Sequence, residues 1–298
     1  MARRDARWGY AFIAPWIFGM LAFTLGPMVA TLVFSFLNLE IATSQAVEFV
    51  GFENYERLVR DDRTWDTLLA TLKYALVGLP VMVALPISLA LLVNNRSLKF
   101  PSLFRSLFFM PYIIPLVAAV LSWQEMLNPQ SGWLNSWLRM VGISDAPSWL
   151  FDTRWVYPGL VIVSIWAIGF GFLVSLAGLK GIPSDLYDAA AVDGAGWWAR
   201  FRHVTFPMLS PVVFYMLVLA VVEVFQYFLV PLVLNDGTGD PGGATLFYNL
   251  HIYKTFFTFQ EMSYGAALAW LLFAIILVVT FVLFRTSRRW VYYASQAR

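Results

Sequence analysis

Six long apolar runs alternate with polar segments along the chain, and each run is long enough to cross a membrane as a helix. A bilayer core about 30 Å thick needs about 20 helical residues. We therefore predict that the 298 residues form a single-domain, all-α polytopic membrane bundle. Its six transmembrane helices are predicted at about 10–36, 68–93, 103–124, 156–179, 208–234 and 264–284. Pro111 and Pro115 interrupt the third run, which indicates burial inside the bundle, where neighbours can satisfy the freed carbonyl groups.

Lys and Arg side chains are divided unevenly between the segments that join these runs. The two ends and the loops near 94–105 and 180–202 carry about twice as many as the loops on the other side. By the positive-inside rule, both termini and the 180–207 loop are expected to be cytoplasmic. The 40–66 segment is then external.

The external segments contain apolar side chains that suit the membrane interface. Within FVGFENYERLVRDDRTWDTLL, four residues recur at helical spacing and predict a short amphipathic helix that packs on the bundle: Phe52, Tyr55, Leu58 and Val59. Trp133, Trp137 and Trp149 follow in a second external segment. We expect these tryptophans to act as interfacial anchors and packing groups.

The composition narrows the possible functions. Hydrophobic residues make up 60% of the chain and charged residues 13%, whereas soluble domains average about a quarter charged. The net charge of +2 gives no reason to expect a nucleic-acid partner. There is no cysteine, and the two histidines, His203 and His251, are too few for a three-histidine zinc site. Because the chain also lacks a GxxxxGK[ST] loop, we expect no ATP hydrolysis, no catalytic residue and no metal on it.

Glu223 is the only ionisable residue well inside a predicted span. Gln226 and Tyr227 follow at i+3 and i+4, so the three side chains would share one helix face. A carboxyl group that faces lipid costs at least about 2.5 kcal/mol, and this face is therefore expected to point into the bundle or a wet cavity. Two interpretations remain open. The group could bind a neutral polyol such as a sugar, or Glu223 could only bond a neighbouring helix.

The loop between the fourth and fifth runs is unusually well specified and reads LYDAAAVDGAGWWARFRHVTFPMLSP. We predict a short helix that begins with Ser184 as its N-cap and has Asp188 near its positive end. The alanines at 189–191 would let another surface approach the backbone closely, and Gly194 is expected to end the helix. A second short helix is predicted at about 197–203. The loop could still be a mere connector between spans.

This run resembles the cytoplasmic EAA loop of membrane permease subunits from binding-protein-dependent ABC importers. That pattern is E-A-A, then D-G-A, then an aromatic residue, an aliphatic residue and L-P. The matching residues are Ala189, Ala190, Asp193, Gly194, Ala195, Phe201, Val204 and Pro207, with Asp188 in the place of the usual glutamate. FVGFENYERL and LNDGTGDPGGAT are similar to further segments of the carbohydrate-uptake class, and the N-terminal span is similar to that of maltose-type permeases.

The resemblance implies two sets of functional residues. In that family the EAA loop docks in a cleft of the ATPase subunit, which implies a coupling contact at Asp188, Ala189, Ala190, Asp193, Gly194, Ala195, Phe201 and Pro207. Polar residues of the family's fifth span contact the sugar midway across the membrane. The implied substrate path therefore contains Glu223, Gln226, Tyr227 and, from the fourth span, Phe170.

We interpret the chain as the permease subunit of an ATP-driven sugar importer in a bacterial or archaeal cytoplasmic membrane, the cell inner membrane. The implied partners are a second permease subunit, two ATPase subunits and an extracytoplasmic substrate-binding protein, with a carbohydrate as substrate. ATP and Mg would be bound by the ATPases, and no cofactor by this chain. The alternative is a self-sufficient, proton-coupled secondary carrier that uses Glu223. An intramembrane enzyme is a third and weaker possibility.

Overall fold

The computed structural model describes residues 2–40, 47–95 and 97–293, so the basic positions Arg96 and Arg298 used for the orientation lie outside the described residues. The regular elements of the described chain are helices, apart from one short β-hairpin. Four helical stretches are long and apolar enough to cross a membrane, and two bent helix pairs raise the number to as many as six. An all-α, multi-pass membrane bundle is therefore confirmed, with four to six spans.

The chain divides into two compact parts, Met1–Trp65 with His251–Phe273 and Asp66–Leu250 with Ala274–Arg298. Three helices cross the boundaries between these parts in the sequence: α4 (Asp62–Val93), α14 (Tyr248–Phe257) and α15 (Met262–Ser287). The length of α4 and α15 reflects the long apolar runs in the sequence.

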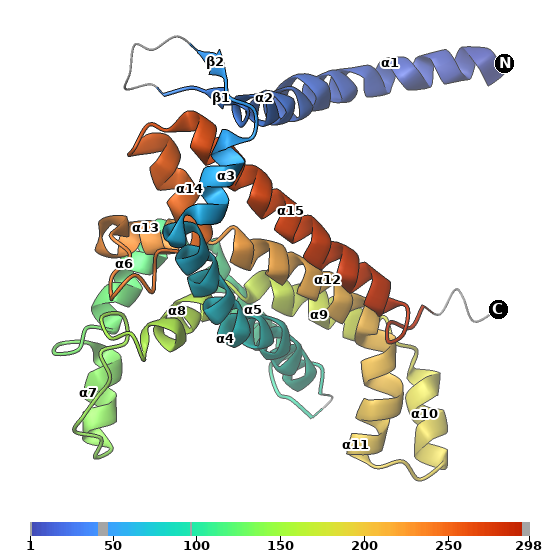
Figure 1. The fold of residues 1–298 in the computed structure, drawn as a ribbon. Helices are drawn as coiled ribbons and strands as arrows, with labels where there is room; N and C mark the ends of the chain where they lie inside the picture. The colour runs from blue at the N-terminus through green and yellow to red at the C-terminus, as the bar shows by residue number, and fades with distance from the viewer. Residues whose placement is uncertain (1, 41–46, 96, 294–298) are drawn as a thin grey trace. The chain divides into compact units, whose positions relative to one another are not determined.

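The first part begins with an apolar helical run that forms the first predicted span (Figure 1). It consists of α1 (Ala2–Met20), the π-helix η1 (Leu21–Leu25) and α2 (Gly26–Phe34). None of the apolar Phe12–Phe34 stretch is buried within this chain. Such a surface suits lipid or a partner helix. The chain then forms a hairpin of β1 (Leu37–Asn38) and β2 (Glu48–Phe49), with Leu37 opposite Phe49.

The predicted amphipathic helix is α3, Glu53–Arg60. Leu58 is buried, and the Tyr55 hydroxyl lies 2.8 Å from Ser35 Oγ. Phe52 and Val59, which were expected on the same packed face, are largely exposed. Phe52 precedes the helix with non-helical dihedral angles, and Val59 is turned about 100° from Leu58 around the helix axis.

The second part contains most of the remaining helices. Beyond Asp66 of α4 they are α5 (Pro101–Phe109), η2 (Met110–Ile113), α6 (Leu116–Met126), α7 (Trp133–Met140), α8 (Val156–Ile165), α9 (Gly169–Lys180), α10 (Ser184–Val192), α11 (Trp197–Arg200), η3 (Phe201–Thr205), α12 (Phe206–Phe225), α13 (Leu229–Val233) and η4 (Leu234–Gly237). Large side chains such as Tyr74, Leu160 and Phe247 are fully buried in its core. In α7, Trp133 and Trp137 are exposed, as expected for interfacial anchors.

Three predicted spans are not continuous helices. The third bends by 101° between Ile113 and Leu116, as its prolines predict. The fourth bends by 60° between α8 and α9, and the sequence did not predict this break. The span predicted at 208–234 lies within one apolar stretch of spanning length, Trp197–Gly237, but its helix is interrupted between Phe225 and Leu229.

The break in the fourth span accompanies a close approach of α9 to η2. A Cβ atom added at Gly169, the first residue of α9, would lie 2.9 Å from Tyr112 Cβ and 3.0 Å from the Phe108 carbonyl oxygen. These distances are shorter than ordinary contacts, so a residue with a side chain would push the two segments apart. The bend is therefore set by tertiary packing.

The short helix predicted at about 197–203 is present, but it is not a separate element. The chain passes from α11 through the π-helix η3 into α12 without leaving helical geometry. Pro207 and Pro211 lack the N–H group needed for an interior helical bond, and the wider π-turn just before Pro207 accommodates the mismatch. Both prolines therefore lie within one long helical stretch.

Candidate functional site

A cavity of about 760 Å³ lies in the second part of the chain, where the three interruptions meet. Its wall includes Ile114 after η2, residues 166–168 between α8 and α9, and residues 226–228 after α12. In a membrane, irregular backbone is tolerated only where protein covers it or where it lines a wet cavity. The three breaks therefore lie where the cavity or its wall can satisfy the freed backbone groups.

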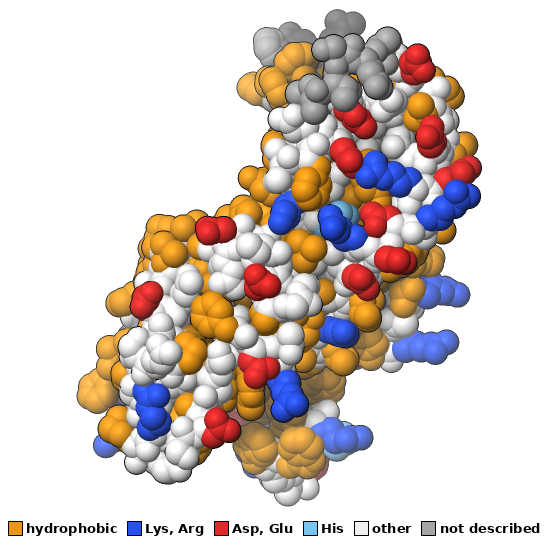
Figure 2. Space-filling model, turned by 60° about the vertical axis from the view of Figure 1, so that its left-hand side comes forward, with side chains coloured by type: hydrophobic (Ala, Val, Ile, Leu, Met, Phe, Trp, Pro, Cys, Tyr) orange, Lys and Arg blue, Asp and Glu red, His pale blue; other side chains and the backbone are white. Residues whose placement is uncertain are grey.

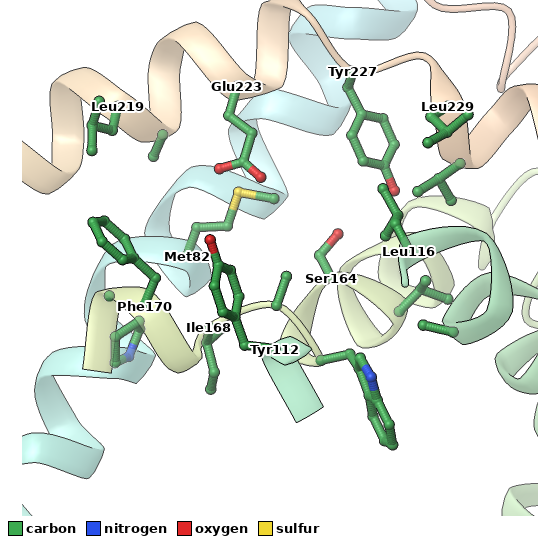
Figure 3. A pocket seen from close by; sticks show the side chains of 18 of the residues that line it. Met82, Tyr112, Leu116, Ser164, Ile168, Phe170, Leu219, Glu223, Tyr227 and Leu229 are labelled. Carbon is green, nitrogen blue, oxygen red and sulfur yellow. The ribbon is translucent and has the colours of Figure 1, made fainter. Parts of the chain in front are cut away.

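An acid and two aromatic rings face this space. The Glu223 side chain, from the last turn of α12, points into the cavity (Figure 3). Tyr112 of η2 directs its hydroxyl toward the same space. Its ring packs on that of Phe170 from α9, with centroids 6.3 Å apart and an interplanar angle of 29°. Together they offer a hydrogen-bond acceptor, a hydroxyl group and two apolar ring faces.

Further polar groups lie deeper in the wall. Ser164 Oγ is 2.8 Å from the Tyr74 hydroxyl, and the Tyr74 ring stacks on Tyr227 with centroids 4.7 Å apart. The Tyr227 hydroxyl and the Trp166 Nε1 are buried without a hydrogen-bond partner in the described part of the chain. Leaving such groups unpaired costs about 1–3 kcal/mol each, so water or a ligand at the wall would stabilise them.

All four residues of the predicted substrate path line this cavity. Glu223, Gln226 and Phe170 are open to it, and all three are exposed. Tyr227 contributes mainly to the packed wall. Gln226 lies just past the end of α12, and its carbonyl oxygen accepts a hydrogen bond of 2.7 Å from Asn249 Nδ2. The cavity brings these residues together, and a role in transport remains a prediction.

Sequence reasoning missed three wall residues that carry polar groups, Tyr112, Ser164 and Trp166. A signal for Tyr112 was present, because it lies between the two prolines that break the third span. Ser164 and Trp166 lie in an apolar run whose one proline, Pro158, is far from the bend. Their placement depends on the bend between α8 and α9.

The predicted coupling loop forms a helical hairpin of α10 and α11 at one end of the second part (Figure 1). The Tyr187 hydroxyl lies 3.1 Å from Thr205 Oγ1 and joins the two arms. At the bend, Arg200 Nε donates a 2.7 Å hydrogen bond to the Ala195 carbonyl oxygen. The hairpin is thus fixed by specific polar contacts.

Gly194 ends α10, as predicted. Its φ of +74° lies in the left-handed region that glycine adopts most easily. The N–H groups of Gly194 and Ala195 bond to the carbonyl oxygens of Ala191 and Ala190, at 3.0 and 2.9 Å. These two bonds form the Schellman motif of a helix end.

The predicted N-cap of α10 is wrong. Pro183 occupies the N-cap position and Ser184 is the first residue of the helix. The Ser184 hydroxyl lies 3.4 Å from the Asp185 carboxylate and caps no backbone group. A serine beside proline was a local signal, but the proline dihedral angles define the start of the helix.

The hairpin exposes an unusual amount of apolar surface. No residue of α10 is buried, Val192 is 89% exposed and Trp197 is 75% exposed. The Trp197 and Trp198 rings stack on Phe201, with centroids 5.9 and 5.5 Å apart. An exposed apolar surface of this kind is typical of a protein contact.

The predicted coupling residues divide between this surface and the helix behind it. The exposed ones are Asp188, Ala189, Asp193 and Gly194, whereas Ala190, Ala195 and Phe201 are half-buried. Pro207 lies further along, in the first turn of α12. The hairpin therefore presents the alanine and aspartate positions outward and uses the others for its own structure.

Comparison with known proteins gives consistent similarities. The family model described as "Binding-protein-dependent transport system inner membrane component" matches residues 59–292. The probable ABC transporter permease protein YesP of Bacillus subtilis is 36% identical over 99% of this chain and 94% of its own length. The lactose transport system permease protein LacF of Rhizobium radiobacter is 31% identical, over 94% of each chain.

Two further similarities concern an archaeal relative and a solved structure. The trehalose/maltose transport system permease protein MalF of Thermococcus litoralis is 31% identical over 96% of this chain and 95% of its own. A chain of a bacterial ABC transporter involved in the import of the acidic polysaccharide alginate has a TM-score of 0.81 at 24% identity, covering 96% of both chains. This last similarity supports the fold.

Proposed function

The chain belongs to the family of binding-protein-dependent transport system inner membrane components, and on that premise we propose that its cavity beside Glu223 is the path of a carbohydrate through the membrane. The chain is the permease component of an ABC importer and not an enzyme. Relatives named for lactose and for trehalose or maltose support a sugar as its substrate.

The observation that carries this proposal is the meeting of three broken spans at one cavity. Breaks free backbone carbonyl and N–H groups, and here they do so around an acid and two aromatic rings. A sugar presents hydroxyl groups at its edge and C–H groups on its faces. Glu223 would accept hydrogen bonds from the hydroxyl groups, while Tyr112 and Phe170 would pack against the apolar sugar face. The negative charge of Glu223 favours a neutral substrate over an anionic one.

The α10–α11 hairpin is the proposed contact with a cytoplasmic ATPase. Its exposed alanines and tryptophans would fit a cleft of the ATPase. The hydrogen bonds within the hairpin would keep it rigid, so that movement of the cleft would be transmitted to α12, with which α11 is continuous. In this proposal the hairpin and both termini would be cytoplasmic. ATP and Mg would stay on the ATPase subunits.

The remaining subunits complete the proposed assembly. A second permease would form the other half of the pore, and a second ATPase would act on it. An external binding protein would deliver the sugar. The solved alginate transporter was described in complex with its alginate-bound periplasmic protein, which supports a delivery step of that kind here.

Uptake into liposomes tests the proposal against the proton-coupled carrier, the alternative that the family similarity does not support. The complete assembly, with ATP inside and sugar-loaded binding protein outside, should accumulate labelled sugar. The chain alone should not accumulate it under an imposed proton gradient. Uptake by the chain alone under that gradient would contradict an ATP-driven permease.

A further inference from the structure

A second cavity, of about 880 Å³, lies in the first part of the chain and belongs to no function described above. It is formed by α3, the starts of α4 and α15, and α14. Its wall is strongly charged: the titratable or charged residues on it are Arg57, Arg60, Asp61, Arg63, His251 and Glu261, beside Tyr264. Lys and Arg side chains gather beside Asp and Glu side chains on the face drawn in Figure 2.

Both acids of the cavity are already paired within the protein. Arg57 Nη2 lies 2.7 Å from Glu261 Oε2, and its guanidinium group stacks on the Tyr264 ring at 4.0 Å. Tyr264 donates a 2.6 Å hydrogen bond to Asp61 Oδ2. Burial raises the pKa of Asp61, but the hydrogen bonds from Tyr264 and the Arg63 N–H outweigh it and lower the pKa overall. Asp61 is therefore ionised.

Three nitrogen-bearing groups are left for a ligand. Within the described residues, Arg60 forms an ion pair only with Glu56, at 3.8 Å, and its side chain is 81% exposed. The Arg63 side chain makes no hydrogen bond or ion pair within the described residues. His251 is only 3% exposed, and its Nε2 has no partner in the same part of the chain. The cavity lining itself contains three arginines and two carboxylates.

The cavity lies at the ends of two membrane spans. α4 begins at Asp62 and α15 at Met262, and both are long enough to cross a bilayer. The first turns of such helices lie at the depth of the lipid headgroups. Trp65 marks the same level, since its indole Nε1 donates to the Val59 carbonyl oxygen at 3.0 Å and its side chain is 46% exposed. A charged cavity at this depth suits the headgroup of a phospholipid.

We propose that this cavity binds the phosphodiester of an anionic phospholipid. The guanidinium groups of Arg60 and Arg63 match phosphate oxygens in geometry and charge. His251 supplies a buried nitrogen with no partner among the described residues. A free inorganic phosphate has the same oxygens but no acyl chains to hold it at the membrane, and a carboxylate from a docked protein would not need headgroup depth.

Native mass spectrometry of the full chain, purified with the subunits that accompany it and stripped of lipid, tests the site. Titration with phosphatidylglycerol should show one tight site, and phosphatidylcholine with the same acyl chains should bind it more weakly. The double variant Arg60→Gln/Arg63→Gln should weaken the tight site about tenfold. Arg154→Gln, a control at an exposed arginine outside the cavity, should leave it unchanged.

Three results would overturn the proposal. Unchanged phosphatidylglycerol affinity in the double variant would remove the arginines from the site. Displacement of the lipid by equimolar inorganic phosphate would indicate a free-anion site. If the double variant kept its lipid affinity but bound an external binding protein more weakly, the cavity would be a protein-docking surface. His251→Phe gives a second reading of the same site, since it removes Nε2 without touching an exposed residue, and should also weaken the lipid.

Discussion

A side chain at Gly194 is predicted to weaken the coupling of this permease to its ATPase. Gly194 has a φ of +74°, and a Cβ atom built there would meet no other atom within 4 Å. The cost of a substitution is therefore one of backbone conformation and not of steric contact. Left-handed geometry costs a residue with a Cβ atom about 1–2 kcal/mol, and more if it is β-branched.

The strain can be relieved only by opening the bend between α10 and α11. If the ATPase binds the bent form, a cost of about 1–2 kcal/mol lowers its affinity about 5- to 30-fold. Asparagine tolerates left-handed geometry better than most residues, so the loss should increase from Gly194→Asn to Gly194→Ser to Gly194→Val. Membrane insertion should not change.

Gly196 provides a matched control two residues away. A Cβ atom there would also meet nothing within 4 Å, but its φ is −70°, and serine is favoured at this N-cap position of α11. We expect Gly196→Ser to keep wild-type affinity for the purified ATPase in nanodiscs. Equal affinity in Gly194→Ser and the wild type, or an equal loss in Gly196→Ser, would refute the reasoning.

Arg200, Glu223 and His251 each allow a further test. Arg200→Met removes the hydrogen bond that holds the bend between α10 and α11 and should lower the affinity for the ATPase about tenfold. Arg202→Met is the control and should leave the affinity unchanged. Equal effects of the two substitutions would contradict a role of the Arg200 hydrogen bond. Glu223→Ala should lower sugar-stimulated uptake about tenfold at unchanged basal ATP hydrolysis, with Glu125→Ala as control, and unchanged uptake would leave Glu223 a structural role. Burial lowers the pKa of His251 from 6.5 to about 4. The contribution of the neutral, buried ring to the stability of the fold is therefore complete above pH 6.5 and is lost as the pH falls toward 4. His251→Gln should therefore reduce the acid-induced fall in unfolding temperature by the equivalent of at most about 3 kcal/mol. The same dependence of unfolding temperature on pH in the variant and the wild type would contradict this role of His251.

The parts of the fold that depend on local chemistry could be predicted from the sequence. Apolar runs of spanning length predicted the membrane helices, and Pro115 predicted the break in the third span. The glycine at 194 predicted the end of α10. Each of these signals acts within a few residues of where it stands, so a pattern along the chain is enough to find it.

The parts that depend on distant contacts could not be predicted. The bend between α8 and α9 depends on the close approach of Gly169 to Tyr112, which is distant in the sequence. No proline lies at the bend to indicate it. The charged cavity depends on pairs such as Arg57 with Glu261. The residues predicted around Glu223 do line one cavity. However, α12 ends at Phe225, so Gln226 reaches the cavity from the break after the helix and not from a shared helix face.

The central claim is that the cavity beside Glu223 carries the sugar and opens under the control of the ATPase. The chain contains no cysteine, so Leu219→Cys places a single thiol on the cavity wall. A polar thiol reagent applied to the reconstituted assembly should label position 219 to an extent that changes when ATP is trapped and falls when the sugar is added. Leu277→Cys, on an exposed position of α15 outside the cavity, should show neither change. Labelling at position 219 that is the same with and without nucleotide and sugar would contradict the claim.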